Sequence, residues 1–167
     1  MSPEEALFLL REAACPDNVV EHCVAVADTG MALARNMQDD HVVDIRLVQA
    51  GGLLHDIGRA LTHGIDHGVV GAQLLRERGV SSALQKICER HVCAGIPREV
   101  AVEIGLPPRD FIPLTLEEKI VCHADNLTNH TVEDLQQTWQ NFFGKKNGEI
   151  IVRYLDNLHE ELSPYLV

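Results

Sequence analysis

An adjacent histidine and aspartate, His55-Asp56, end an apolar helical run in this chain, and Gly58 follows them closely. Neighbouring side chains on a helix point roughly 100° apart. The two can therefore face one ion together only at a helix end, which we expect Gly58 to provide. Imidazole and carboxylate groups without thiolate suit Fe, Mn, Zn, Co or Ni. Taken alone, the pair would be interpreted as a cap and a core histidine, so the metal hypothesis depends on the rest of the chain.

Four further residues of the same chemistry lie on separate predicted elements. His22 lies on the apolar stripe of a helix expected at about 18–37, and His67 starts a later helix. His91 ends another helix, and Asp125 lies inside a third. A buried imidazole or carboxylate without a partner is costly. Six such groups on five elements are therefore explained most simply by one shared metal centre.

The order of these residues resembles that of the HD-domain superfamily of metal-dependent phosphohydrolases, and Leu-His-Asp-Ile-Gly resembles its HDIG variant. The resemblance runs from residue 22 to about 127, and its middle segments are most similar to small stand-alone archaeal and bacterial members. It implies two sets of metal ligands. The first set is His22, His55, Asp56 and Asp125, and the second is Asp56, His67 and His91. Asp56 would bridge the two metals.

The resemblance also implies a reaction. One or two divalent ions are expected, with iron or manganese first and zinc, nickel or cobalt as alternatives. A metal-bound hydroxide would attack phosphorus while the ions neutralise the developing charge. Asp56 and Arg59 are the predicted catalytic residues. Arg59 would meet a substrate phosphate or pin a ligating carboxylate, although a solvated arginine explains it equally well.

The expected substrate is a small nucleotide-like or cyclic phosphate, cleaved by a phosphomonoesterase or phosphodiesterase. Two other functions stay open. The same ligand order permits a diiron oxygenase, and a non-catalytic module that binds nucleotide would also keep the fold. The spacing of His63 and His67 resembles a helical zinc signature, but Gly64 replaces its Glu and disfavours helix, so we reject that interpretation.

Three residues outside the ligand sets are candidate substrate contacts: His63, Arg98 and Arg109. His63 could bind substrate or metal, but its Thr-His-Gly context suits a turn as well. Arg98 and Arg109 lie in two irregular segments that follow His91, and Pro107-Pro108 would stiffen the second. The remaining predictions are that Asp66 orients His67, that His123 packs or supports a ligand, and that the other three histidines (His41, His130 and His159) lie at the surface.

Composition narrows the class of partner. The net charge of −11 argues against a nucleic-acid polymer, whose phosphates are bound by clustered Lys and Arg. It permits a small phosphorylated ligand, because metal ions can reverse the sign inside a cleft. The five cysteines show no C-x-x-C spacing and suit buried apolar positions in a reducing compartment. With no apolar run near the ~20 residues of a membrane span, and with Glu4 and Glu5 at the N-terminus, we expect a cytoplasmic protein. A homo-oligomer stays open.

Apolar spacing predicts an all-α fold of seven to nine helices in one domain, residues 1–167. The metal-site core is expected at about 18–130, with the C-terminal helices of 131–167 packed on it. Helices are predicted at the following ranges: 3–14, 18–37, 43–57, 67–77, 82–91, 98–104, 115–127, 132–143 and 148–162. The segment 106–113 contains three prolines and is expected to be an irregular loop.

Overall fold

A computed structural model describes residues 1–166, and over this range the fold is all-α, as the sequence predicts. The α-helices are α1 (Pro3–Glu12), α2 (Asp17–Asn36), α3 (Ile45–Leu54), α4 (His67–Glu77), α5 (Ser82–Arg90), α6 (Arg98–Glu103), α7 (Leu116–Leu127) and α8 (Val132–Leu162). Two short 3₁₀ helices, η1 (Ile57–Ala60) and η2 (Ser163–Tyr165), complete the elements. Two isolated bridges, Cys93 with Gly95 and Ile96 with Phe111, are the extended pairing within these residues.

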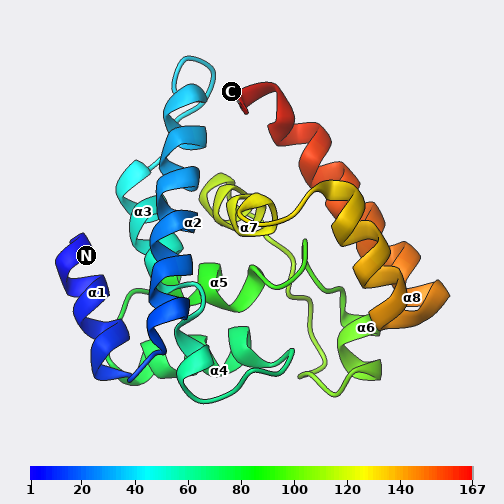
Figure 1. Ribbon diagram of the computed structural model, residues 1–167, viewed down its shortest axis with the longest axis horizontal. Coiled ribbons are helices and arrows are strands. Elements are labelled where there is room, and N and C mark those ends of the chain that lie inside the picture. Colours follow the sequence, from blue (N-terminus) through cyan, green and yellow to red (C-terminus); the bar gives the residue numbers. More distant parts are fainter. Residues whose placement is uncertain (167) are drawn as a thin grey trace.

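Helix α7 lies in the middle of the molecule and contacts α2, α3, α5 and α8 (Figure 1). Its buried side chains include Ile120, Val121 and Ala124, which join the main apolar core. Helix α1 packs on α3, while α4 packs on α5 and η1. Because α7 carries one predicted ligand and touches the helices that carry most of the others, its position decides whether they meet.

Small residues let α3 approach its neighbours closely, as its sequence suggested. A Cβ at Gly52 would lie 2.6 Å from the Cα of Ala27 on α2. A Cβ at Gly51 would lie 2.7 Å from the Cδ1 of Ile87 on α5. Real Cβ atoms do not approach other atoms this closely, so glycine at these positions allows α3 to sit between α2 and α5.

Helix α8 consists of two arms that turn at Gly144, where φ is +74°. The arms run back along each other (Figure 1), and Gln136 Nε2 donates a hydrogen bond to Asp156 Oδ1 at 2.7 Å. A Cβ at Gly148 would lie 2.7 Å from the Cα of Gln140 in the first arm. The two glycines thus permit the turn and the close return, and the break predicted between the last two helices is confirmed.

Several predicted boundaries were wrong by one turn or less, and the caps differ. Helix α3 ends at Leu54, and Gly58 lies inside η1 instead of ending the helix. Asp17 is the first residue of α2 and makes no capping hydrogen bond. Thr115 Oγ1 accepts a hydrogen bond from Glu118 N at 3.2 Å and caps the start of α7. The side chain of Glu118 is buried and turned toward Arg90.

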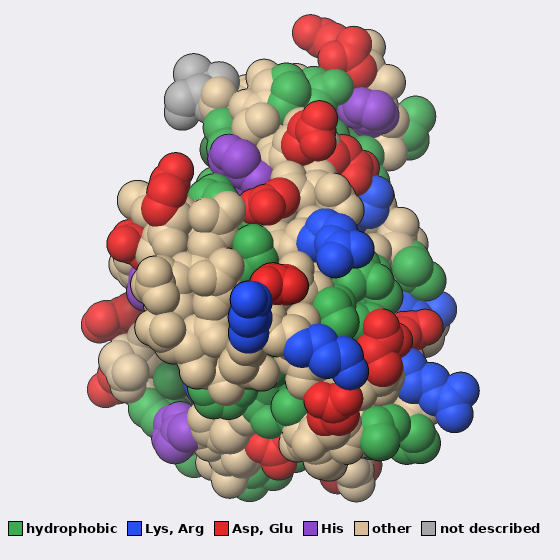
Figure 2. Space-filling view, turned by 90° about the vertical axis from the view of Figure 1, so that its right-hand side faces the viewer, with side chains coloured by type: hydrophobic (Ala, Val, Ile, Leu, Met, Phe, Trp, Pro, Cys, Tyr) green, Lys and Arg blue, Asp and Glu red, His purple; other side chains and the backbone are tan. Residues whose placement is uncertain are grey.

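None of the helices in residues 1–166 combines the length and the apolar character that a bilayer span requires. On the face that Figure 2 shows, Lys and Arg side chains lie among Asp and Glu side chains instead of forming a continuous basic stripe. This distribution agrees with the net charge of −11.

Candidate metal centre

The six predicted ligand residues come from five elements and converge on one point of the fold. His22 lies on α2, His55 caps the C-terminal end of α3, and Asp56 follows it with φ −102° and ψ 14°. His67 is the first residue of α4 and His91 caps α5, while Asp125 lies in the last turn of α7; the side chains of both histidines are buried. Because the chain leaves α3 at this point, the adjacent residues 55 and 56 can point to the same place.

Three of the histidines are oriented in the same way. The Nδ1 atoms of His55, His67 and His91 each lie 2.7 Å from the backbone carbonyl oxygen three residues earlier, at Gly52, Gly64 and Cys88 respectively. A carbonyl oxygen only accepts, so each Nδ1 carries the proton and donates. Nε2 is therefore the ring nitrogen of each histidine that can bind an ion. This backbone support is the kind that fixes the tautomer of metal-binding histidines.

The first cluster joins α2, α3 and α7. His22 Nε2 lies 2.9 Å from Asp125 Oδ1, and His55 Nε2 lies 3.5 Å from the same oxygen. The rings of His22 and His55 meet edge to face, with centroids 5.3 Å apart. His55 Nε2 is also 3.9 Å from Asp56 Oδ2, which connects this cluster to the next.

The second cluster joins the start of α4 and the end of α5 to Asp56. His67 Nε2 and His91 Nε2 lie 3.2 and 3.4 Å from Asp56 Oδ1. The two Nε2 atoms are 3.1 Å apart. Asp56 thus lies between the two clusters, in the bridging position that the sequence predicts for it.

The chemistry of these atoms fits a cation. Two Nε2 lone pairs 3.1 Å apart repel each other unless a proton or a metal ion lies between them. His55 Nε2 and Asp56 Oδ1 are buried and have no hydrogen bond of normal geometry. A buried polar atom without a partner costs about 1–3 kcal/mol. Divalent cations would satisfy all of these atoms at once, so the residues present are suited to hold the predicted metal.

The electrostatics of the cluster keep its carboxylates ionised. Burial alone would raise the pKa of Asp56, but the neighbouring imidazoles of His55, His67 and His91 lower it well below the usual range. Burial would likewise raise the pKa of Asp125, and His55 and His22 lower it. Burial lowers the pKa of His91, which favours its neutral form. Burial would also lower the pKa of His55, but Cys23, Asp56 and Asp125 raise it well above the usual value. A metal ion bound at His55 would displace its proton, because imidazoles bind metal in the neutral form and carboxylates in the ionised form.

Gly58 explains how His67 reaches the cluster. A Cβ at this position would overlap the carbonyl oxygen of His67 and lie 2.7 Å from the backbone nitrogen of Gly71. Only glycine therefore allows η1 to lie directly against the first turn of α4. The role of Gly58 is close packing rather than the helix break that the sequence suggested.

Arg59 is tied to the carboxylate of Asp56. Its Nε donates to Asp56 Oδ2 at 2.8 Å, and its Nη1 donates to the carbonyl oxygen of His63 at 3.4 Å. Its Nη2 lies 3.4 Å from His67 Nε2. Of the interpretations that the sequence left open, the structure realises the one in which the guanidinium pins a carboxylate, and the side chain still borders the adjacent cavity.

The other predicted substrate contacts lie away from this point. His63 is exposed, and it contributes its backbone carbonyl rather than its ring. Arg98 is exposed, and Arg109 forms an ion pair with Glu89 and lies over the ring of Phe111. None of the three lines the cavity at the metal centre. The carboxylate of Glu89 and the ring of Phe111 hold Arg109 away from the cluster. The sequence of the loop does not reveal the contact with Glu89.

The prediction that Asp66 orients His67 was wrong. The Asp66 carboxylate accepts a hydrogen bond from Thr62 Oγ1 at 3.0 Å, and the Gly64 carbonyl orients His67 in its place. His159 is half-buried, and its Nδ1 lies 3.4 Å from Nε2 of the buried His123, whose pKa burial lowers to about 4. His123 packs in the interior, as expected.

Four of the five cysteines keep their protons more firmly than a free thiol does. Burial raises the pKa of Cys15 to about 11 and that of Cys93 to about 12. Burial also raises the pKa values of Cys88 and Cys122, and both donate to backbone carbonyls, Cys88 to His55 O at 3.1 Å and Cys122 to His91 O at 3.3 Å. A nucleophilic or metal-binding cysteine requires a lowered pKa, so the candidate ligand atoms near these four cysteines are nitrogen and oxygen.

A cavity of about 330 Å³ opens at the cluster. Besides predicted ligands and Arg59, its lining contains residues that the sequence did not single out: Ile65, Val92, Cys93, Asn126, Asn129, Leu135 and Trp139. His130, predicted as a surface residue, is exposed at the rim of this cavity. One feature of the sequence could have indicated that α8 contributes to this lining, because Trp139 is the single tryptophan of the chain.

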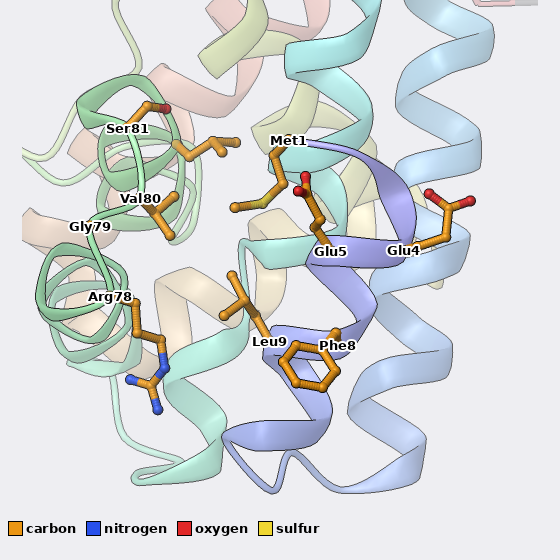
Figure 3. Close-up of a pocket in the computed structure, with 10 residues that line it drawn as sticks. Met1, Glu4, Glu5, Phe8, Leu9, Arg78, Gly79, Val80 and Ser81 are labelled. Atoms are coloured by element: carbon orange, nitrogen blue, oxygen red, sulfur yellow. The ribbon is translucent and has the colours of Figure 1, made fainter.

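A larger cavity of about 650 Å³ lies between α1 and the turn from α4 to α5. Figure 3 shows Met1, Leu9 and Val80 pointing into this space, while Glu4 points away from it. Its described lining is mostly apolar and has no histidine. Ligand chemistry is therefore concentrated in the smaller cavity, beside the six converging residues.

A family model described as HD domain matches residues 19–130, so this chain belongs to the HD-domain family. An uncharacterized protein of Methanocaldococcus jannaschii is 50% identical over 155 residues, which cover 90% of this chain and 91% of that protein. A tRNA (cytidine(56)-2'-O)-methyltransferase of Thermoplasma volcanium is 42% identical over 96% of this chain. The chain spans 47% of that methyltransferase, so the similarity concerns about half of it.

Among solved structures, the HD domain of the phosphodiesterase PgpH from L. monocytogenes has the same fold. It aligns with a TM-score of 0.58 and 17% identity over 93% of this chain and 97% of that one. The same domain in complex with cyclic-di-AMP aligns with a TM-score of 0.57 and 17% identity over 92% of this chain and 96% of that one. At this identity the similarity defines the fold alone, and the chemistry must be argued from the residues.

Proposed function

We propose that this protein is a metal-dependent phosphohydrolase that cleaves a small nucleotide-like or cyclic phosphate. The observation that carries the proposal is the pair of clusters that share Asp56, with His67 Nε2 and His91 Nε2 3.1 Å apart and two buried atoms lacking partners. The family supports the hydrolase class. The PgpH domain is solved with a cyclic dinucleotide, which supports a nucleotide-like substrate here.

The chain's own residues would hold the metal and position the phosphate. His22, His55, Asp56 and Asp125 would bind one ion, and Asp56, His67 and His91 a second. Divalent ions supply Lewis-acid activation of water and neutralise charge on the phosphoryl oxygens. Arg59, fixed on Asp56 by its Nε at 2.8 Å, would keep the carboxylate oriented. Its exposed edge would attract the substrate phosphate toward the cluster.

The test is a phosphoester screen with protein purified anaerobically, analysed for its metals and then assayed with Mn, Fe, Co, Ni and Zn. The panel should hold nucleoside monophosphates, 2',3'-cyclic nucleotides, cyclic-di-AMP, diadenosine tetraphosphate and a short RNA. We expect metal-dependent hydrolysis of at least one substrate without oxygen consumption, detected as free phosphate from a monoester or as a new nucleotide product from a diester. Oxygen consumption with no hydrolysis would favour the diiron oxygenase, and nucleotide binding without either would favour a regulatory module.

Matched variants make the screen specific to the cluster. Asp56→Asn keeps the size of the side chain but removes the charge shared by both ligand sets, and we expect it to lose both bound metal and hydrolysis. His41→Ala is the control, because His41 is exposed and its ring contacts Tyr165, outside the cluster. Full activity in Asp56→Asn would refute the assignment.

A further inference from the structure

The lining of the cavity beside the ligand cluster combines two kinds of side chain. Predicted ligands and Arg59 supply charged and polar groups. Leu135 and Trp139, from the first arm of α8, and Ile65, from the segment between η1 and α4, supply apolar groups. Residues four apart on a helix share a face, so Leu135 and Trp139 form one apolar wall. A ligand that carries both an anionic group and an apolar group matches this lining.

Trp139 is suited to hold a flat ring. Its side chain is 8% exposed, and it lines the cavity. Buried tryptophans normally pair their indole N–H. Among residues 1–166 this N–H has no hydrogen-bond partner, and because it is not one of the buried polar atoms without a partner, it is open to solvent. Every nucleobase has a π-face that stacks on such a ring, and the contact tolerates different bases.

Asn126 adds a polar side chain to the lining of the cavity. It follows Asp125 on α7 and is 5% exposed. Within residues 1–166 its side chain makes one weak hydrogen bond, from Nδ2 to Cys122 Sγ at 3.9 Å. Its amide oxygen and second N–H are therefore available. An amide that offers both a donor and an acceptor suits a ribose hydroxyl or the edge of a base.

Size and charge limit the ligand to one nucleotide. A volume of about 330 Å³ is at the small end of the range of ligand sites, roughly 300–1,000 Å³. Among the described residues lining the cavity, Arg59 is the one with a permanent positive charge, and its Nε already donates a hydrogen bond to Asp56. A polyphosphate chain would add negative charges that no further arginine or lysine neutralises.

We propose that this cavity binds a nucleoside monophosphate, with the base stacked on Trp139 and the phosphate at the ligand cluster. The proposal rests on the proposed function for the fate of the phosphate, whereas binding of the base stands on the apolar wall alone. Trp139 is then a specificity-determining residue. It favours mononucleotides over sugar phosphates, which lack a flat aromatic ring to stack. The size and charge of the cavity disfavour nucleoside triphosphates.

Because Trp139 is the single tryptophan of the chain, fluorescence excited at the indole band reports on this wall directly. The metal-loaded full chain would be mixed rapidly with AMP, GMP, CMP and UMP, and with ribose 5-phosphate and ATP, and the fluorescence would be read before turnover. We expect saturable quenching by at least one monophosphate, no quenching by ribose 5-phosphate, and binding of ATP at least about 5-fold weaker. Absence of quenching by all four monophosphates, or equal quenching by ribose 5-phosphate, would overturn the proposal.

Variants separate stacking from packing. Trp139→Leu keeps an apolar wall without the flat ring, and Trp139→Phe keeps a flat ring. Phe142→Ala, on the same arm but 65% exposed, is the matched control. The readout is the ratio of kcat/KM for AMP to kcat/KM for ribose 5-phosphate. Stacking is worth about 1–3 kcal/mol, so Trp139→Leu should lower this ratio roughly 5- to 100-fold, mainly through KM, while Phe142→Ala leaves it unchanged.

The two experiments distinguish this proposal from the proposed function. Quenching by AMP with no metal-dependent hydrolysis would contradict the hydrolase while supporting the nucleotide site. Hydrolysis with no quenching, and with a ratio unchanged in a folded Trp139→Leu variant, would overturn the nucleotide site and leave the hydrolase standing. Thermal unfolding of each variant shows whether it is folded, and Trp139→Phe supplies the test if Trp139→Leu is not.

Discussion

At the scale of single residues, the orientation of the imidazoles decides what the site can bind. His55, His67 and His91 each give their Nδ1 proton to a carbonyl three residues earlier, so each points Nε2 toward Asp56 or Asp125. A histidine free to rotate would instead lose entropy on binding. The ligand atoms are thus held in place by local backbone before any ion arrives.

The two ligand sets predict separable effects on metal content. His67→Ala removes a ligand from the second set only, so we expect it to keep one bound ion where the wild-type protein holds two. His22→Ala should lower occupancy in the first set instead. Metal-to-protein ratios from elemental analysis of dialysed protein measure both effects. Identical ratios in the wild-type protein and in both variants would contradict this division of ligands.

A second residue-scale prediction concerns alkaline pH. Burial, with the nearby Cys23 thiol, raises the pKa of Cys15 from 9 to about 11, so the folded state keeps its proton at a pH where the unfolded chain loses it. The resulting stabilisation is complete below pH 9 and is lost as the pH rises to 11. We expect the free energy of unfolding to fall less steeply between pH 9 and 11 in Cys15→Ala than in wild-type protein, measured by urea titration. Equal slopes would show that the shift is absent.

At the scale of elements, the site depends on how closely α4 approaches the end of α3. Gly58 in η1 lies against the first turn of α4, and Gly71 lies against Cys88 Sγ, which a Cβ would meet at 2.6 Å. Cys88 in turn donates to the carbonyl oxygens of His55 and Gly68. Tight packing between η1, α4 and α5 thus positions His67 and His91 next to Asp56.

Replacing Gly58 should therefore disrupt both fold and site. Gly58→Ala places a methyl group on the carbonyl of His67, and we expect a loss of at least about 2 kcal/mol in the free energy of unfolding, together with reduced metal binding. Gly30→Ala is the matched control, because the new Cβ would lie no closer than 3.1 Å to Val48 Cγ1. Chemical denaturation measures both variants. A Gly58→Ala protein as stable as Gly30→Ala would contradict the packing argument.

A buried ion pair holds a second junction between elements. Arg90 Nη1 at the end of α5 lies 2.9 Å from Glu118 Oε2 near the start of α7. The same oxygen accepts a hydrogen bond from Leu114 N at 2.8 Å. These contacts fix the loop that precedes α7 to the helix that ends at His91. The position of Asp125 relative to His91 follows from this junction, since both helices are rigid.

At the scale of the whole molecule, bound metal would link helices that are far apart in the sequence. His22 and Asp125 are 103 residues apart in sequence, and they meet at 2.9 Å. An ion bound there, and one bound by Asp56, His67 and His91, would tie α2, α3, α4, α5 and α7 together. A ligand that binds only the folded state stabilises it by mass action.

Metal removal is therefore expected to lower the stability of the whole domain. At a free metal concentration about 100 times the dissociation constant, the linkage amounts to roughly 2.7 kcal/mol per site. Thermal unfolding of the protein in EDTA, and again after Mn is restored, measures the difference. Asp56→Asn should gain little from Mn. A midpoint that is the same with and without metal would mean that the clusters do not bind it.

The sequence by itself determined the fold class and the residues that converge. Apolar spacing is a local property, so it predicts helices, and the Gly144–Gly148 segment marks the turn between the arms of α8. The six ligand types follow from what a nitrogen–oxygen metal site requires. Their order along the chain resembles the family's order, which supplied the grouping into two sets.

Only the tertiary structure decided which side chains surround the ligands. Arg109 pairs with Glu89, twenty residues away, and Gly64 rather than Asp66 orients His67. Trp139 reaches the cavity because α8 packs against α7. Such contacts join elements distant in sequence, and their geometry is set by packing and by competition among charged partners. The periodicity of apolar residues is a local property, so it predicts the helices. It does not predict how the helices pack or which charged partners pair.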